Sequence, residues 1–315
     1  MKFARNVLVA ATAVASLTVG WPASATAATT PLSHARVTEH FDLLGGQLPE
    51  NIALGPNGSV DLSFAASRQI VRVTSEGSVH VLATLPAPAD AGVHTPVLGF
   101  PLVTGLVRGA HGTLYFLYAT GTTDLTGVWR LTPGGTPERI AALPADGLPN
   151  GLALHAGRLY ITDSVRGVIW RVPAVGGEAK VWAGGPELAS TGFLGANGLK
   201  VHNGAVWASD MDKGTMVRIP LQRNGTAGPA EIRAADLAGI DDFAFIGRSD
   251  RILAALDQSN RVALVEPDGT HTIVLGAQDG LQNPTALAVR GNSVYVTSAA
   301  YSTGQDPNLL TARLR

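Results

Sequence analysis

The sequence predicts an all-β fold, a six-bladed β-propeller built from four-stranded blades. First, a polar residue just before a short apolar run recurs at intervals of 53, 46, 47, 45 and 43 residues, at Asn51, Thr104, Asn150, Asn197, Asp242 and Thr285. A period of this length is typical of one propeller blade. Second, Gly, Pro, Asn and Asp separate short β-rich runs throughout, and no segment shows a sustained helical period.

Each repeat contains its β-rich runs in the same order. The second runs are VDLSFA from Val60, TLYFLYAT from Thr113, RLYITDS from Arg158, AVWASDM from Ala205, RILAALD from Arg251 and SVYVTSA from Ser293. Five repeats continue with a third and a fourth run, whereas the sixth ends at LLTARLR with only three. We expect ARVTEHF, Ala35 to Phe41, to supply the missing strand. Pairing the two ends of the chain in this way would close the ring and remove an open sheet edge.

The composition fits one large folded domain. The chain has 315 residues, of which 45% are apolar and 15% charged, so a large buried core is expected and disorder is not. The formal net charge is -1, and no basic stripe is evident, so nucleic acid is not an expected partner.

The first residues have the pattern of an export signal. Lys2 and Arg5 precede an alanine-rich apolar stretch from Val7 to Gly20, and small-residue cleavage sites follow as far as Ala27. We therefore expect a signal peptide at residues 1–27 and a single propeller at residues 28–315, secreted to the extracellular side. The alternative is an N-terminal membrane anchor. Since the chain has no Cys, neither a lipid-modified cysteine nor a disulfide can form.

Four repeats place an oxygen-bearing side chain immediately before the apolar run. The stretches are LPEN, LPNGLAL, GANGLKV and GIDDFAF, and they supply Glu50, Asn150, Asn197 and Asp242, with Asp241 beside it. The innermost strands of a propeller line its channel, so equivalent positions in different blades converge at one mouth. Carboxylate and amide oxygens are the ligands that Ca²⁺ prefers, which predicts a site for Ca²⁺ or another divalent cation. The alternative is that Asn-Gly and Asp-Asp are ordinary turn residues at blade junctions.

This pattern resembles that of the six-bladed calcium propellers of the regucalcin/gluconolactonase (senescence marker protein-like) family, with paraoxonase and diisopropyl fluorophosphatase as more distant relatives. The resemblance implies that Glu50, Asn150, Asn197 and an acid of GIDDF coordinate a catalytic metal ion. In our alignment Asp242 is the counterpart of Asn150 and Asn197, whereas a paraoxonase-like site would use Asp241 and its neighbour together. Blade two offers only Thr104 and Arg108 where the family often has a substrate-contacting polar residue.

These observations lead to an expected activity on a small-molecule substrate. A divalent cation at the channel mouth would polarise the carbonyl of a lactone or ester for attack by water. The general base would be Asp242, Asp241 or His94, which lies in the long connection PAPADAGVHTPVLGF. The alternative is a non-catalytic propeller that binds a ligand or a partner and holds a structural ion. A condensing enzyme like strictosidine synthase would share the fold without needing the metal ligands. We expect a monomer.

Other acidic residues have structural interpretations or none. Asp163 and Asp210 follow second strands, where Asp typically accepts hydrogen bonds from the backbone of a turn. The sequence indicates no role for Asp257 or Asp306.

Overall fold

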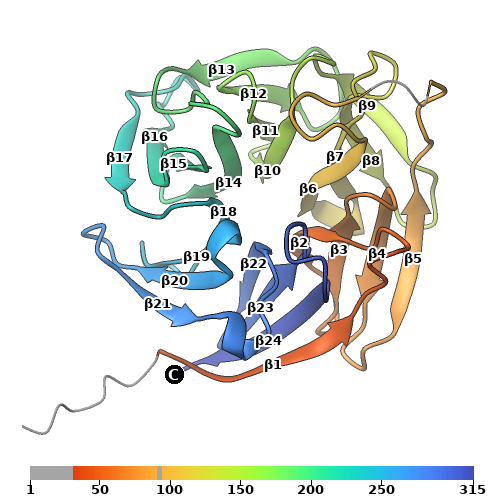
Figure 1. Cartoon of the computed structure of the whole chain (residues 1–315). Coiled ribbons are helices and arrows are strands. Elements are labelled where there is room, and N and C mark those ends of the chain that lie inside the picture. Colours follow the sequence, from red (N-terminus) through yellow and green to blue (C-terminus); the bar gives the residue numbers. More distant parts are fainter. Residues whose placement is uncertain (1–30, 91–93) are drawn as a thin grey trace, which may run out of the picture. The chain divides into compact units, whose positions relative to one another are not determined.

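Six four-stranded antiparallel sheets form a closed ring, which confirms the predicted propeller (Figure 1). The structure, a computed structural model, describes residues 31–90 and 94–315. The predicted signal peptide, residues 1–27, lies outside the described residues. The described part of the chain contains no helix that is long and apolar enough to cross a membrane.

Each blade is numbered by the position of its innermost strand along the chain. Blade 1 consists of β2 (Pro49–Leu54), β3 (Val60–Phe64), β4 (Gln69–Val73) and β5 (Val79–Thr84). Blade 2 consists of β6 (Leu102–Arg108), β7 (Leu114–Ala119), β8 (Gly127–Leu131) and β9 (Glu138–Ala142). Blade 3 consists of β10 (Pro149–His155), β11 (Arg158–Asp163), β12 (Val168–Pro173) and β13 (Lys180–Gly184).

The second half of the ring repeats this order. Blade 4 consists of β14 (Ala196–His202), β15 (Ala205–Asp210), β16 (Thr215–Pro220) and β17 (Glu231–Ala234). Blade 5 consists of β18 (Ile240–Phe245), β19 (Ile252–Leu256), β20 (Arg261–Val265) and β21 (His271–Leu275). Blade 6 consists of β22 (Pro284–Arg290), β23 (Ser293–Ser298), β24 (Asn308–Leu314) and β1 (Leu32–His40). The described residues also form single-turn 3₁₀ helices at η1 (Ala110–Gly112), η2 (Asp257–Ser259) and η3 (Ala277–Asp279).

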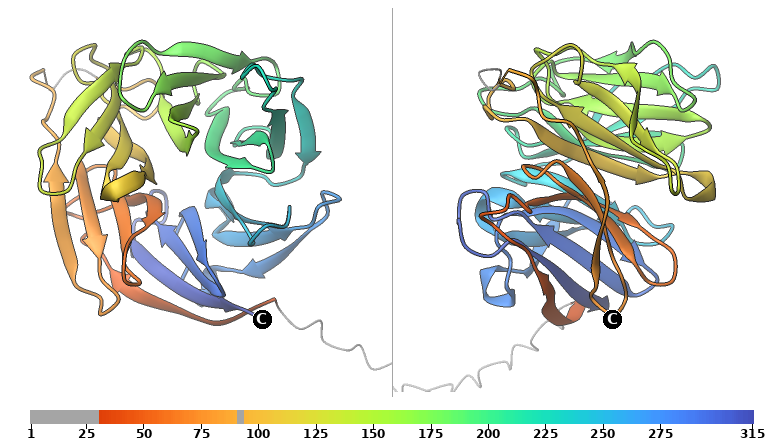
Figure 2. Two further views of the ribbon diagram at one scale, coloured as in Figure 1. Left: turned by 180° about the vertical axis from the view of Figure 1, so that it is seen from behind. Right: turned by 90° about the vertical axis from the view of Figure 1, so that its right-hand side faces the viewer.

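The ring closes as the sequence predicts. β1 pairs antiparallel with β24 from Leu32 opposite Leu314 to His40 opposite Asn308, so the outer strand of blade 6 comes from the beginning of the described chain. Figure 2 shows the same ring from behind and from the side, with the C-terminus at the rim beside β1. A closed ring leaves no innermost strand unpaired, so every channel-lining position is held in fixed register.

Tight turns join the innermost strand to the second strand of a blade. In blade 4 the pair His202 and Ala205 encloses a two-residue turn whose residues, Asn203 and Gly204, have φ values of 44° and 70°. Positive φ at both positions is the requirement of a type I′ hairpin turn, and Asn-Gly meets it at the lowest steric cost. These turns lie at the end of the blade away from the starts of the innermost strands.

The apolar core lies between blades. One buried cluster joins Trp207 and Met216 of blade 4 to Phe243 and Leu256 of blade 5. The side chain of Phe243 is fully buried, and truncating such a residue typically costs about 3–5 kcal/mol. Packing of this kind holds neighbouring innermost strands against each other.

Candidate functional site

Every innermost strand carries a β-bulge near its first residue. In blade 3, for example, Pro149 pairs with Asp163 and Leu152 with Ile161, so Asn150 and Gly151 together oppose one residue of β11. The other blades show the same irregularity, and their equivalent residues are Glu50, Thr104, Asn197, Asp241 and Thr285. A bulge re-aims side chains that regular pairing would place on the sheet face. The six bulges therefore form a ring around one mouth of the channel.

This register corrects our alignment at two positions. Ile240 pairs with Leu256 and Phe243 with Ala254, which makes Asp241 the counterpart of Asn150, while Asp242 takes the place of Gly151. In blade 1 the bulge falls between Pro49 and Asn51, so Glu50 rather than Asn51 is the equivalent residue. Sequence alignment failed here because both stretches contain two adjacent polar residues.

The two threonines of the ring have a structural role. Thr104 Oγ1 donates a hydrogen bond to the carbonyl of Pro149 at 2.8 Å, and Thr285 Oγ1 donates to the carbonyl of Pro49 at 2.8 Å. Each bond ties an innermost strand to the innermost strand of the next blade. Because both hydroxyls bind backbone carbonyls, only the carboxylates and amides of the other four blades are available to bind a ligand at the mouth.

Glu50 is held by a residue from the other end of the chain. The Tyr301 hydroxyl, which lies in the loop between β23 and β24, donates to Glu50 Oε2 at 2.6 Å. Figure 1 shows this dark-blue loop beside β2. The residue Tyr301 is 40% exposed, whereas Glu50 is 7% exposed, so the tyrosine covers the carboxylate from the solvent side.

The two amides occupy buried positions. Asn150 is 6% and Asn197 1% exposed. Asn197 Oδ1 is fully buried and has no hydrogen-bond partner, while its Nδ2 contacts Met211 Sδ at 3.9 Å. A buried amide oxygen without a donor costs free energy, of the order of 1–3 kcal/mol, unless something binds it.

Asp242 lies in an ion pair. Lys200 Nζ is 2.6 Å from Asp242 Oδ1 and 2.5 Å from Oδ2, and Asn51 Nδ2 donates to Oδ2 at 3.2 Å. Asn51 belongs to blade 1 and Lys200 to blade 4, so this network joins strands across the channel. Both oxygens of Asp242 are therefore engaged by protein donors, and Asp241 is left as the acid of this pair that can face a ligand.

Asp257, for which the sequence indicated no role, also belongs to this site, because its charge raises the pKa of both Glu50 and Asp241. It begins η2 after β19, and its Oδ2 is buried without a hydrogen-bond partner. Asn283 Nδ2 donates to the Asp257 carbonyl at 3.1 Å, and Asn283 Oδ1 accepts from the backbone N–H of Ser302 at 2.9 Å and of Thr303 at 3.1 Å. Asn283 thus fixes Asp257 and the loop that carries Tyr301 relative to each other.

A register difference explains why Asp257 escaped notice. In sequence its stretch, ALDQ, aligns with ITDS and WASD. The acids of those two stretches, Asp163 and Asp210, accept hydrogen bonds from turn backbone as predicted. Strand pairing makes Leu256 the counterpart of those two acids, so Asp257 is one residue further along. Counting from the bulge partners would have revealed the offset.

Burial and mutual repulsion dominate the electrostatics of this cluster. Burial raises the pKa of Glu50 to about 7, helped by the charges of Asp257 and Asp242 and opposed by the Tyr301 hydrogen bond. Burial likewise raises the pKa of Asp257 to about 7, although the hydrogen bond from Asn283 opposes the shift. For Asp241, burial and then the charge of Glu50 raise the pKa well above its usual value. The mouth therefore holds more acidic groups than its surroundings can stabilise as anions.

The protein's overall likeness to known structures is at the level of fold. Scans of protein-family models and of curated proteins return no match for this sequence. Among solved structures, the calcium-binding protein regucalcin from Agrobacterium tumefaciens is 18% identical with a TM-score of 0.64, covering 87% of this chain and 92% of its own. A gluconolactonase from Xanthomonas campestris is 15% identical with a TM-score of 0.62, covering 89% and 95%.

The fold is that of the regucalcin and gluconolactonase propellers. A virginiamycin B lyase from Staphylococcus aureus also shares it, at 15% identity and a TM-score of 0.59, covering 90% of this chain and all of the other. Propellers of this shape therefore carry different chemistries, and the residues at the mouth have to decide the function.

Within residues 31–90 and 94–315, no three His, Asp or Glu side chains lie close enough together to hold a metal ion by themselves. A cation at this mouth would need the amide oxygens of Asn150 and Asn197 to complete its ligands. The oxygen atoms available fit a hard cation, because Asn197 Oδ1 and Asp257 Oδ2 are buried without donors.

His94 lies in the connection from β5 to β6, which leads to the mouth end of blade 2, and its side chain is exposed. No hydrogen bond or ion pair joins it to another described residue. Arg108, the other polar residue of blade two, is engaged away from the mouth, where its Nη1 pairs with Asp61 Oδ2 at 2.5 Å.

Proposed function

We propose that this protein is a secreted hydrolase of lactones or related esters that depends on a divalent cation at the channel mouth. The observation that carries the proposal is the concentration of buried acids there. Burial raises the pKa of Glu50, Asp241 and Asp257, and the charge of Asp257 adds to the shifts of the other two. Lys200, which partly opposes the shift of Asp241, is already engaged by Asp242. Buried carboxylates without counter-ions are costly, and a bound cation removes that cost.

The ligands we propose are Glu50, Asn150, Asn197 and Asp241. Two carboxylates and two neutral amides suit Ca²⁺ by charge and by hardness. Asp242 is excluded from this set, because Lys200 and Asn51 engage both of its oxygens. The ion would supply Lewis acidity that polarises a substrate carbonyl and stabilises the oxyanion formed from it.

The surrounding residues would bind and move the proton. Asp257 has a pKa of about 7 and an unpartnered Oδ2, so at neutral pH this oxygen can accept a proton from an attacking water. The Tyr301 hydroxyl keeps the Glu50 carboxylate oriented through their 2.6 Å hydrogen bond. His94 is a second candidate for proton transfer, since it lies shortly before β6, whose first residues are at the mouth.

A matched pair of amide substitutions tests the proposal. We expect the purified protein to hydrolyse members of a panel of lactones and aryl esters, and chelation to abolish the activity. Asn197→Ala should abolish it as well with the fold retained, whereas Asn292→Ala, in an exposed turn on the other face, should leave it unchanged. Metal analysis of the same samples reports whether a divalent ion is bound.

Each component can fail separately. A folded, Ca²⁺-loaded sample that hydrolyses nothing across the panel argues against the hydrolase. If chelation then lowers the thermal stability, the alternative of a binding propeller with a structural ion is favoured. Secretion is tested by the N-terminal sequence of protein recovered outside the cell, which should begin near residue 28.

A further inference from the structure

A cavity lies between blades 1 and 6, and its lining residues belong to β1, β3, β4, β23 and β24 and to the turns next to them. Its volume is about 530 Å³, within the range of small-molecule sites. Gly58 and Ser293, which line it, belong to the turn side of their blades, where the innermost strands end. None of the described lining residues belongs to an innermost strand, so the cavity shares no residue with the ring of bulges at the mouth.

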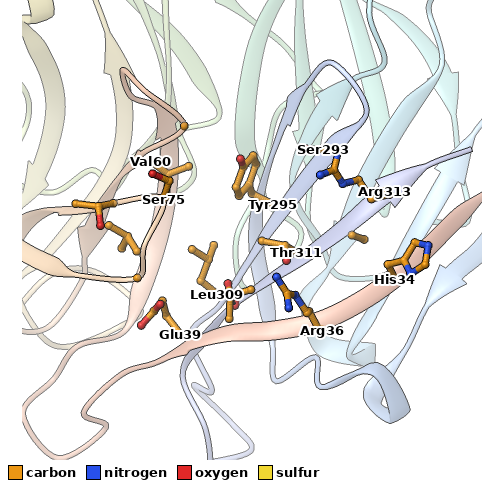
Figure 3. Close-up of a pocket in the computed structure, with 16 residues that line it drawn as sticks. His34, Arg36, Glu39, Val60, Ser75, Ser293, Tyr295, Leu309, Thr311 and Arg313 are labelled. Carbon is orange, nitrogen blue, oxygen red and sulfur yellow. Dashed lines mark hydrogen bonds between the residues drawn. The ribbon is translucent and has the colours of Figure 1, made fainter.

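The charged groups of this cavity are mostly cationic. Arg36 of β1 and Arg313 of β24 are exposed, and neither makes an ion pair or a hydrogen bond through its side chain with any described residue. Figure 3 shows both guanidinium groups, with His34 beside them, on the side formed by β1 and β24. Among the described residues that line the cavity, Glu39 is the only acid, and it lies near the Gly77 turn.

The register explains why these cations share one face. Arg36 is opposite Thr311 in the pairing of β1 with β24, and Arg313 is two residues further along β24. Side chains two apart on a strand point to the same side of the sheet, so Arg313, Thr311 and Arg36 face the cavity together.

A third guanidinium lies beneath the lining. Arg290 Nη2 donates to the carbonyls of Gly55 at 2.6 Å and Ser59 at 3.0 Å, whereas its Nη1 is buried and has no acceptor. This Nη1 is 3.8 Å from the position that a Cβ on Gly58 would occupy, and the Arg290 guanidinium lies 6.0 Å from the centre of the Tyr295 ring. Because Gly58 and Tyr295 line the cavity, an unsatisfied cationic donor sits directly behind its wall.

Hydroxyl groups accompany the cations. Ser293, Tyr295 and Thr311 line the same part of the cavity, and their hydroxyls make no hydrogen bond within the described residues. Val60, Val73 and Leu309 give the cavity an apolar side, which belongs to the buried cluster between blades 1 and 6. Paired guanidinium groups match carboxylate and phosphate oxygens, and free hydroxyls match a polyol.

We propose that this cavity binds a small polyhydroxylated anion, a sugar acid or a sugar phosphate, whose charged group contacts Arg36 and Arg313. The Ser293, Tyr295 and Thr311 hydroxyls then bind the polyol part. The site is independent of the hydrolase proposed above, because it shares no residue with the mouth.

Isothermal titration with matched sugars tests this site. The probes are glucuronate, glucose 6-phosphate, glucose and inorganic phosphate. We expect saturable binding of at least one of the two sugar anions, no binding of glucose, and weaker binding of inorganic phosphate. Affinity should fall at least tenfold in the Arg36→Gln/Arg313→Gln variant, and it should weaken with salt. The Arg223→Gln/Arg248→Gln variant removes the same charge from exposed turns without ion pairs and should bind as the unmodified protein does.

The remaining outcomes are decisive as well. Binding of glucuronate alone assigns the anion as a carboxylate, and binding of glucose 6-phosphate alone assigns it as a phosphate. Failure of both sugar anions to bind, equal loss in the two double variants, or equally tight binding of inorganic phosphate overturns the proposal. So does binding that is lost in Asn197→Ala but kept in Arg36→Gln/Arg313→Gln, since it would place the ligand at the mouth.

Discussion

The ion pair between Lys200 and Asp242 gives the sharpest test of the electrostatics in the channel. The Asp242 side chain is 3% exposed and that of Lys200 28%, and their closest atoms are 2.5 Å apart. In Lys200→Met the carboxylate keeps only the Asn51 amide, at 3.2 Å, and stays near Glu50 and Asp241. Removing one partner of a buried pair typically costs about 3–5 kcal/mol. Because Lys200 is partly exposed, we expect about 3 kcal/mol.

Urea unfolding at pH 8 with chelator present, followed by tryptophan fluorescence, measures this loss. The double variant Lys200→Met/Asp242→Asn removes both charges and should recover to within about 1 kcal/mol of the unmodified protein, since an amide is cheaper to bury than a carboxylate. Lys180→Met is the control, because Lys180 pairs with Glu178 at 3.4 Å on the surface and its loss should cost less than about 1 kcal/mol. A loss below 1 kcal/mol for Lys200→Met, or a double variant as unstable as the single one, would refute the reasoning.

Three further predictions concern the mouth. Glu50 and Asp257 have folded-state pKa values of about 7, above those of the unfolded chain, so the folded protein keeps their protons to higher pH. With chelator present, the free energy of unfolding should therefore fall as the pH rises from about 4 through 7. An increase in the free energy of unfolding from pH 5 to pH 8 would contradict this. Tyr301→Phe removes the donor to Glu50 and should lower the free energy of unfolding by about 1–3 kcal/mol at pH 8, but by much less at pH 5, where Glu50 is protonated. If urea unfolding shows an equal decrease at both pH values, the carboxylate is not involved. Gly198→Ala places a Cβ 2.6 Å from the Cα atom of Asp242 in the neighbouring blade and should destabilise the fold by about 3 kcal/mol in thermal unfolding. Gly192→Ala, whose added Cβ has no atom within 4 Å, should change the stability little.

The fold could be predicted from the sequence because its signal is repeated six times. An error at one strand does not disturb a period set by the others, and the three-strand sixth repeat pointed to β1 as the closing strand. Turn chemistry such as Asn203-Gly204 is also local, so the residues concerned determine it without help from distant contacts.

The composition of the mouth could be predicted only in part. Glu50, Asn150, Asn197 and Asp241 are at equivalent positions of the ring, as the repeat implies. The choice between Asp241 and Asp242 depends on a bulge, and one residue of register exchanges the two faces of a strand.

Two further residues of the site, Lys200 and Tyr301, could not be found from local pattern. Lys200 lies within an apolar run that is typical of a buried strand, and only the ring brings it to Asp242. Tyr301 is 251 residues from Glu50 in the sequence. Contacts of this kind depend on the closure of the whole ring, which no window of sequence contains.

Ring closure also sets an order on folding. The strand Leu32–His40 is among the first described segments to be synthesised, but its partner Asn308–Leu314 is at the very end of the chain. Until β24 is present, β1 and β23 of blade 6 have no strand between them, the Tyr301 loop is not anchored, and Tyr301 cannot cover Glu50. The contact with the greatest sequence separation thus completes the fold and the mouth at the same time, so neither is complete before β24 and the loop that carries Tyr301 are in place.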